Sequence, residues 1–179
     1  MEIRNNVFME YYRDENGTLS KLSKQNVDTG MGFERMCSVL QEKASVYDTD
    51  LFQPAIQCVA AFTNLAYSDH QKRFRIVADH ARTAFMLIND GLIPSNIAAG
   101  YVLRMIIRRM VYNTMLLKNC STEEYQPFLT SLLKTFKTLR AFNHPEIIRV
   151  MMDEIKIFQK TIQNGMQILT TIIEKEKSE

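Results

Sequence analysis

Long apolar runs are absent from this 179-residue sequence, in which no stretch approaches the roughly 20 consecutive apolar residues that span a bilayer. The first six residues, Met-Glu-Ile-Arg-Asn-Asn, also lack the apolar segment that follows the basic start of a secretory signal. These absences argue against both a membrane protein and a secreted one. They predict no membrane partner and, by default, a cytoplasmic location.

Cysteine is also scarce, and its positions fit neither of the usual cysteine frameworks. Cys37, Cys58 and Cys120 are odd in number and widely spaced, so they match neither a disulfide scaffold nor a zinc site. His80 has no second histidine at the spacing of a metal site. The sequence therefore predicts reduced thiols and no bound metal.

A strong excess of charge of one sign is missing as well, since 22 Lys and Arg residues stand against 20 Asp and Glu residues. The net charge is only +2, so any affinity for nucleic acid must come from a local basic face. Hydrophobic residues make up 46% of the chain, which is typical of a globular protein with a real core.

Strand-forming residues are concentrated in the first 30 positions. Residues 4–13 are rich in aromatic and β-favouring types and run toward an Asn16-Gly17 pair, which is typical of a hairpin turn. A weaker strand pattern follows at residues 18–22. From residue 31 onward the apolar spacing is that of a helix. The sequence predicts a mainly α fold, a helical bundle preceded by a small antiparallel β segment.

Two apolar stripes mark the longest expected helices. The first stripe is Phe74, Val77, Ala78, Ala81, Phe85 and Ile88. It is closed by Gly91, which suits the left-handed residue that follows a helix. The second helix is expected to begin near Pro145, and its stripe is Ile155, Phe158, Ile162, Met166, Leu169 and Ile173. Ser95 is expected to cap another helix, over about residues 97–117.

The stretch from Val27 to Arg35 reads Val-Asp-Thr-Gly-Met-Gly-Phe-Glu-Arg and is the strongest candidate for chemistry. Its glycines let backbone approach a base or phosphate closely, and Arg35 offers a planar fork to phosphate oxygens. It is neither a dinucleotide fingerprint, because Arg35 stands at the third glycine position, nor a P-loop. Taken alone, the same stretch also fits an ordinary strand-to-helix turn with surface charges.

This stretch resembles motif 3 of class II aminoacyl-tRNA synthetases, and its form is close to that of the alanyl-tRNA synthetase family. Other segments agree with that family in the same order: residues 2–9, 47–52, 77–82, 90–96 and 100–109. The resemblance is strong over residues 2–110 and thinner beyond, where residues 158–165 match a later helix motif. It implies a domain boundary, with residues 1–45 ending the aminoacylation domain and residues 46–179 forming the helical tRNA-recognition domain.

The resemblance also implies a substrate pocket. Asp28 would bind the ammonium group of alanine, Val7 would wall a pocket for a small side chain, and Asn5 and Gly30 would line it. ATP would lie against the backbone of Gly30 and Gly32 and the guanidinium of Arg35. Asp28 and Arg35 would thus be the catalytic residues, since Arg35 would stabilise charge on the leaving pyrophosphate.

A second implied site faces tRNA. Asn96 matches the asparagine that the family presents to the acceptor stem of tRNA(Ala), near its G·U wobble pair. Arg104 and Arg108 are four residues apart on one helix face, and with Arg109 they would follow the RNA backbone. For any single arginine, a solvated face balanced by nearby acids remains the alternative.

Departures from the family pattern keep two other functions open. Ala99 and Met105 stand where arginines are usual, and Thr170 falls where the family has an aspartate that works with the asparagine. A freestanding RNA-binding paralogue without catalysis, or a helical interaction module, would also explain these changes.

The chain also lacks motifs 1 and 2, which lie upstream of motif 3 in this family. We therefore expect an alanine-tRNA ligase in which this chain supplies motif 3 and acceptor-stem recognition and is inactive alone. Its partners would be alanine, ATP, tRNA(Ala) and the upstream catalytic segment. ATP and Mg²⁺ would be substrates of the intact enzyme, and neither is expected to bind this chain tightly.

Overall fold

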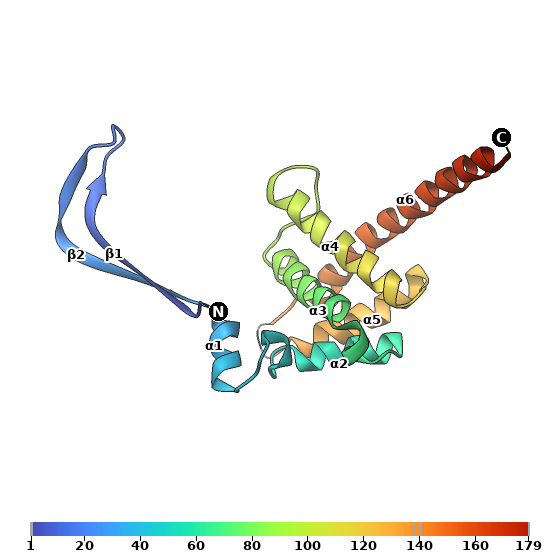
Figure 1. Ribbon diagram of the computed structural model, residues 1–179, viewed down its shortest axis with the longest axis horizontal. Coiled ribbons are helices and arrows are strands. Elements are labelled where there is room, and N and C mark those ends of the chain that lie inside the picture. The colour runs from blue at the N-terminus through green and yellow to red at the C-terminus, as the bar shows by residue number, and fades with distance from the viewer. Residues whose placement is uncertain (1, 138, 140, 179) are drawn as a thin grey trace. The chain divides into compact units, whose positions relative to one another are not determined.

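The computed structural model describes residues 2–137, 139 and 141–178, and it confirms the mainly α class with a small β segment at the start (Figure 1). The chain divides into two compact units, residues 1–52 and 53–179, and each is described by itself. The activity that each unit carries stays a prediction. Within the described residues, no helix is both long and apolar enough to cross a membrane.

The first unit begins with an antiparallel hairpin of β1 (Arg4–Arg13) and β2 (Leu19–Met31). Its turn forms at the expected place, because Gly17 adopts a φ of +84° and the Asp14 carboxylate accepts hydrogen bonds from two backbone N–H groups of the turn. The second strand is much longer than its weak pattern suggested. Both faces of the hairpin are exposed, and the Phe8 side chain is 77% accessible.

A short helix, α1 (Phe33–Leu40), follows the hairpin, and a 3₁₀ turn, η1 (Val46–Asp48), comes next. Gln41 follows α1, and its side chain bonds Asp50, which lies just after η1. Its amide N–H donates to the Asp50 carboxylate at 2.6 Å, and its side-chain carbonyl accepts from the Asp50 backbone N–H at 3.1 Å. The outer side chains of α1 remain exposed, with Leu40 at 75%.

The second unit consists of five helices among the described residues: α2 (Gln53–Thr63), α3 (Tyr67–Asn89), α4 (Ala98–Leu117), α5 (Thr122–Thr135) and α6 (His144–Ser178). The central one is α3, which packs against α2, α4, α5 and α6. All six members of its expected stripe are buried. Gly91 ends it as expected, with a φ of +91° and a backbone hydrogen bond to Ile88.

Two expectations about helix ends and faces need correction. Helix α4 begins at Ala98, and Ile97 directly precedes it. Ser95 lies outside the helix, and its hydroxyl bonds the backbone of Ile97 instead of capping the first turn. In α6, Ile155 is fully buried, but Met166, Leu169 and Ile173 are exposed. The end of α6 extends past the other helices of its unit (Figure 1), so the apolar spacing there has no core to face.

Candidate functional site

The four residues expected to line an alanine pocket lie together on the hairpin. Asn5 pairs with Gly30, and Val7 pairs with Asp28. Directly opposite residues of an antiparallel pair share a face, and so do residues two apart on one strand. Asn5, Val7, Asp28 and Gly30 therefore occupy one face of the hairpin, on two rungs separated by the Asn6–Thr29 pair.

The chemistry of this quartet is one carboxylate beside an apolar wall. The Asp28 side chain is exposed and makes no hydrogen bond or ion pair with the described residues, so its charge is available to a cation. Asn5 donates weakly, at 3.4 Å, to the Glu2 carboxylate. Asp28 can pair with a cation and Val7 offers an exposed apolar surface, and the binding of alanine here stays a prediction.

Arg35 is positioned by the start of the chain. It lies in the first turn of α1, and its Nη1 donates to the Glu2 carbonyl at 2.8 Å. The backbone of Gly32 accommodates its aliphatic stem, because a Cβ at Gly32 would lie 3.0 Å from the Arg35 Cδ. At Gly30 an added Cβ would meet nothing within 4 Å. Gly32 is therefore explained by packing, and a ligand role for Gly30 stays a prediction.

Asn96 lies in the loop between α3 and α4, and this loop rests closely on the first turn of α4. The Ser95 N–H donates to the Gly100 carbonyl at 3.0 Å. A Cβ at Gly100 would stand 2.7 Å from the Ile93 carbonyl and closer still to Ser95. Glycine at position 100 thus lets the loop approach the helix, and Asn96 itself stays exposed with its side-chain oxygen bonded to Arg104 Nη1.

Arg104 and Arg108 meet a carboxylate that sequence reasoning missed. Glu154 of α6 is only 3% exposed, and its Oε1 accepts from Arg108 Nε at 2.7 Å. Its Oε2 lies 3.3 Å from Arg104 Nε, an ion-pair distance without hydrogen-bond geometry. The signal in the sequence was an acid next to buried Met151 and Ile155, since an acid in an apolar stripe is costly unless it is paired.

Arg109 behaves differently from its two neighbours. Its side chain is exposed and makes no ion pair with the described residues. Beside it runs a groove of about 710 Å³ along α4 and α6, lined by His80, Tyr101, Val102, Met105, Ile106, Arg108, Arg109, Tyr112 and Phe158. Arg108 also stacks on Phe158, with its guanidinium carbon 5.3 Å from the ring centroid. The groove thus combines aromatic rings with cationic side chains.

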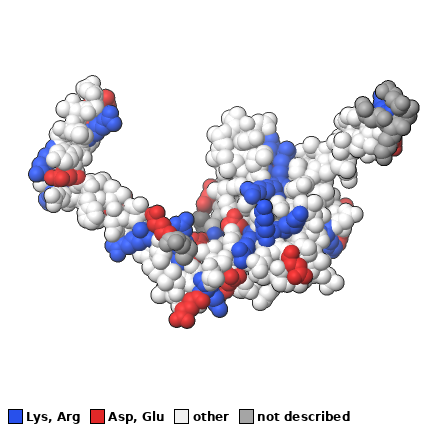
Figure 2. Space-filling model, viewed as in Figure 1, with Lys and Arg blue, Asp and Glu red and all other residues white. Residues whose placement is uncertain are grey.

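Lys and Arg atoms gather on the face of the helical unit seen in Figure 2. The arginines expected to contact tRNA do not contribute equal charge to this face. Asn96, Arg104 and Arg108 are tied together through Glu154, which neutralises part of the arginine charge, whereas Arg109 offers its full charge to solvent.

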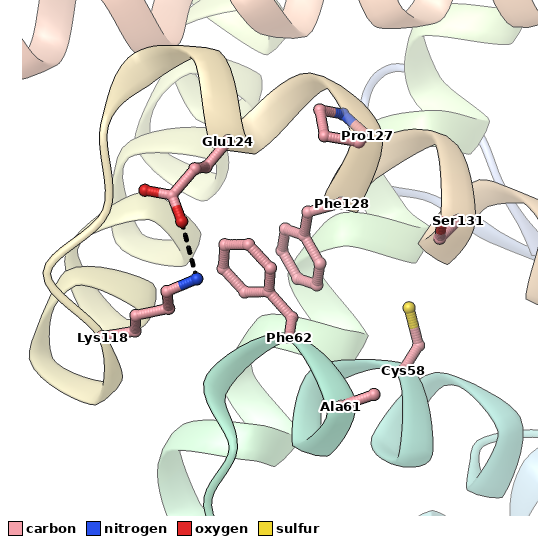
Figure 3. Close-up of a pocket in the computed structure, with 8 residues that line it drawn as sticks. All are labelled: Cys58, Ala61, Phe62, Lys118, Glu124, Pro127, Phe128 and Ser131. Carbon is pink, nitrogen blue, oxygen red and sulfur yellow. Dashed lines mark hydrogen bonds and ion pairs between the residues drawn. The ribbon is translucent and has the colours of Figure 1, made fainter.

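A second hollow of about 480 Å³ lies between α2 and α5 (Figure 3). Its two charged side chains are paired with each other. Lys118 pairs with Glu124 at 2.7 Å, and this hydrogen bond lowers the pKa of the Glu124 carboxyl. Phe62 stacks on Phe128 at 4.1 Å. Burial raises the pKa of the Cys58 thiol at its rim, which makes that thiol a poor nucleophile.

Among the described residues, the His, Cys, Asp and Glu side chains form no group of three or more that could hold a metal ion. The three cysteines are unpaired thiols.

Known proteins similar to this chain are aminoacyl-tRNA synthetases. The family model for class II (A) tRNA synthetases matches residues 1–179. Alanine–tRNA ligase of Thermotoga maritima is 39% identical over 98% of the chain, and the ligases of Petrotoga mobilis and Desulfitobacterium hafniense are 40% and 41% identical over 100% and 94% of it. The chain spans about a fifth of the length of these relatives. It belongs to the class II tRNA synthetase family.

Proposed function

We propose that this chain is part of an alanine–tRNA ligase and supplies motif 3 together with the surface that binds the tRNA(Ala) acceptor stem. The observation that carries the proposal is the strand register, which gathers Asn5, Val7, Asp28 and Gly30 on one face. The relatives are alanine–tRNA ligases, and they do not favour a paralogue without catalysis or an interaction module. We also propose a cytoplasmic location for the protein.

The proposed first step forms alanyl-adenylate. The carboxylate of alanine attacks the α-phosphorus of ATP, and the bond to the bridging oxygen breaks to release pyrophosphate. Asp28 binds the alanine ammonium, and Val7 excludes larger side chains. Arg35 offsets the charge that builds on the leaving pyrophosphate, and Mg²⁺ arrives bound to the ATP phosphates.

In the proposed second step, a hydroxyl of the terminal tRNA adenosine attacks the alanyl carbonyl, and AMP leaves. Asn96 contacts the acceptor stem near its G·U pair, while Arg109 meets the phosphate backbone. Support for these roles comes from the exposure of both residues and from the groove that lies beside Arg109.

The activation step is tested by alanine-dependent exchange between ATP and pyrophosphate. We expect no exchange with the 179-residue chain, because it lacks motifs 1 and 2. In an intact ligase containing this segment, Asp28→Asn should lower exchange about 100-fold, since it removes the charge that binds an ammonium. Glu10→Gln is the matched control, because Glu10 lies on the same hairpin but pairs with Lys21 at 3.5 Å. Equal activity of the Asp28→Asn and Glu10→Gln enzymes would refute the assignment of Asp28.

The RNA-binding role is tested by titrating the chain with acceptor-stem minihelices at several salt concentrations. Arg109→Ala should weaken binding to every stem and reduce the slope of log K against log salt by about 1. Arg149→Ala is the control, because Arg149 is held by Glu146 and Asp153 on its own helix. Equal effects of the two substitutions would count against the proposed surface.

A further inference from the structure

Glu154 is a buried carboxylate whose two oxygens go to two different arginines. Oε1 accepts from Arg108 Nε, and Oε2 lies against Arg104 Nε, both at the crossing of α4 and α6. Its neighbours Met151 and Ile155 are fully buried. A carboxylate at such a position is costly to desolvate, and hydrophobic residues of similar size are often at least as stable there. Stability alone therefore does not account for an acid at this position.

Arg104 is the link between Glu154 and the loop that carries Asn96. Its Nε faces Glu154 Oε2, and its Nη1 donates to the side-chain oxygen of Asn96. The guanidinium is planar and rigid, so the ion pair on its Nε side constrains the direction of its Nη1. The position of the Asn96 side chain is thereby set from α6, 58 residues further along the chain.

This contact also decides which end of the Asn96 amide is presented. An arginine guanidinium has donors and no acceptor, so the Asn96 atom that faces it must be the oxygen. The Asn96 amide nitrogen has no partner among the described residues and remains exposed. Asn96 therefore offers N–H donors outward, and these suit an acceptor atom on a base edge in the shallow groove of an RNA helix.

We propose that Glu154 is a positioning residue for RNA recognition: through Arg104 it holds Asn96 with its amide N–H groups directed at an acceptor on the acceptor stem. This proposal rests on the proposed function.

The test measures binding of the full chain to two minihelices that differ only in a G·U or a G·C pair. Wild-type chain should prefer the G·U stem by roughly 5- to 150-fold, the range for one readable base pair. Glu154→Gln should bring this ratio close to 1 without weakening binding to the G·C stem, because no phosphate contact is lost and the charge of Arg104 and Arg108 is no longer neutralised. A purely structural role would instead weaken binding to both stems together.

Two further variants separate geometry from charge. Arg104→Lys keeps the positive charge but loses the fork, so it should also abolish the preference while retaining the salt dependence. Asp153→Asn is the matched control, because this neighbouring acid is exposed and, among the described residues, its side chain pairs only with Arg149. It should leave the ratio unchanged.

A measurement without RNA guards against misfolded variants. The side-chain amide resonances of Asn96, assigned by their loss in Asn96→Ala, should move in both Glu154→Gln and Arg104→Lys and stay fixed in Asp153→Asn. The positioning role is wrong if those resonances do not move, or if both variants keep the wild-type ratio while Asn96→Ala loses it. Equal binding of wild-type chain to both stems would overturn the proposed stem recognition, and the positioning role with it.

Discussion

The hairpin unit and the helical unit carry their proposed binding residues in opposite ways. In residues 1–52 the substrate quartet is assembled by strand register alone, on a two-stranded sheet whose apolar side chains are exposed on both faces. In residues 53–179 the candidate RNA residues project from helices that share a buried core. A two-stranded hairpin is marginal in water, whereas a packed helical core is not. We therefore expect substrate binding to need further β-strands paired with the hairpin, whereas RNA binding by the helical unit should not need them.

The largest expected contrast comes from removing one phenylalanine in each unit. Phe85→Ala empties a fully buried site of α3 and should lower the free energy of unfolding by about 3–5 kcal/mol. Phe8→Ala in β1 should change it by less than about 0.5 kcal/mol, because that ring is already in water. Urea unfolding followed by helical circular dichroism measures both. Similar losses would show that the hairpin is as well packed as the helices.

Gly100→Ala should be the next largest change. The new Cβ would collide with the Ile93 carbonyl and with Ser95, and such overpacking costs about 1–3 kcal/mol. The collision also displaces the loop that holds Asn96, so the preference for a G·U stem should fall in the same variant. Urea unfolding and minihelix titration check the two effects. Unchanged stability together with an unchanged preference would mean that the loop does not rest on α4 as described.

The loss of folding stability at alkaline pH should come from the helical unit. Burial raises the pKa of Tyr125 above its ordinary value, and contacts with Cys120 and Glu124 add to the rise. The neutral phenol therefore stabilises the fold fully below the unfolded pKa of about 10, and this contribution is lost as the pH rises toward the folded pKa, by about 1.4 kcal/mol per pH unit.

Tyr125→Phe should remove that part of the pH dependence in urea unfolding between pH 9 and 11. Tyr12→Phe is the matched control, because Tyr12 is an exposed hairpin residue, and it should keep the full loss. Identical slopes for the two variants would contradict the assignment to Tyr125.

The smallest expected effect tests the exposed end of α6. An added Cβ at Gly165 meets nothing within 4 Å, so Gly165→Ala should stabilise the helix by about 0.5–1 kcal/mol. Far-ultraviolet circular dichroism should show a small gain in helix and a higher midpoint. A loss of stability would indicate that something packs closely against Gly165.

Local patterns predicted much of the fold. The Asn16-Gly17 turn, the stripe of α3 and the stop at Gly91 all follow from neighbouring residues, and the structure confirms them. The end of α6 shows the limit of this reasoning, because the spacing of Met166 and Ile173 is that of a core helix although both are exposed. Periodicity reports which side chains share a face and says nothing about what covers that face.

The sequence predicted the candidate sites only in part, for the same reason. Residue types suggested Asp28 and Arg104. The register that sets Val7 opposite Asp28 depends on strand pairing, however, and Arg104 and Glu154 are 50 residues apart on different helices. Neither relation is encoded in local spacing. Ser95 is a residue type that favours a helix cap, but its hydroxyl bonds the backbone of Ile97 because α4 begins only at Ala98.

Hydrogen exchange of the chain with and without a G·U acceptor-stem minihelix tests the account most directly. Binding by the helical unit should slow amide exchange in residues 92–109 and leave the strands at residues 4–31 unchanged. Protection confined to residues 4–31, with none in residues 92–109, would contradict the assignment of RNA recognition to the helices.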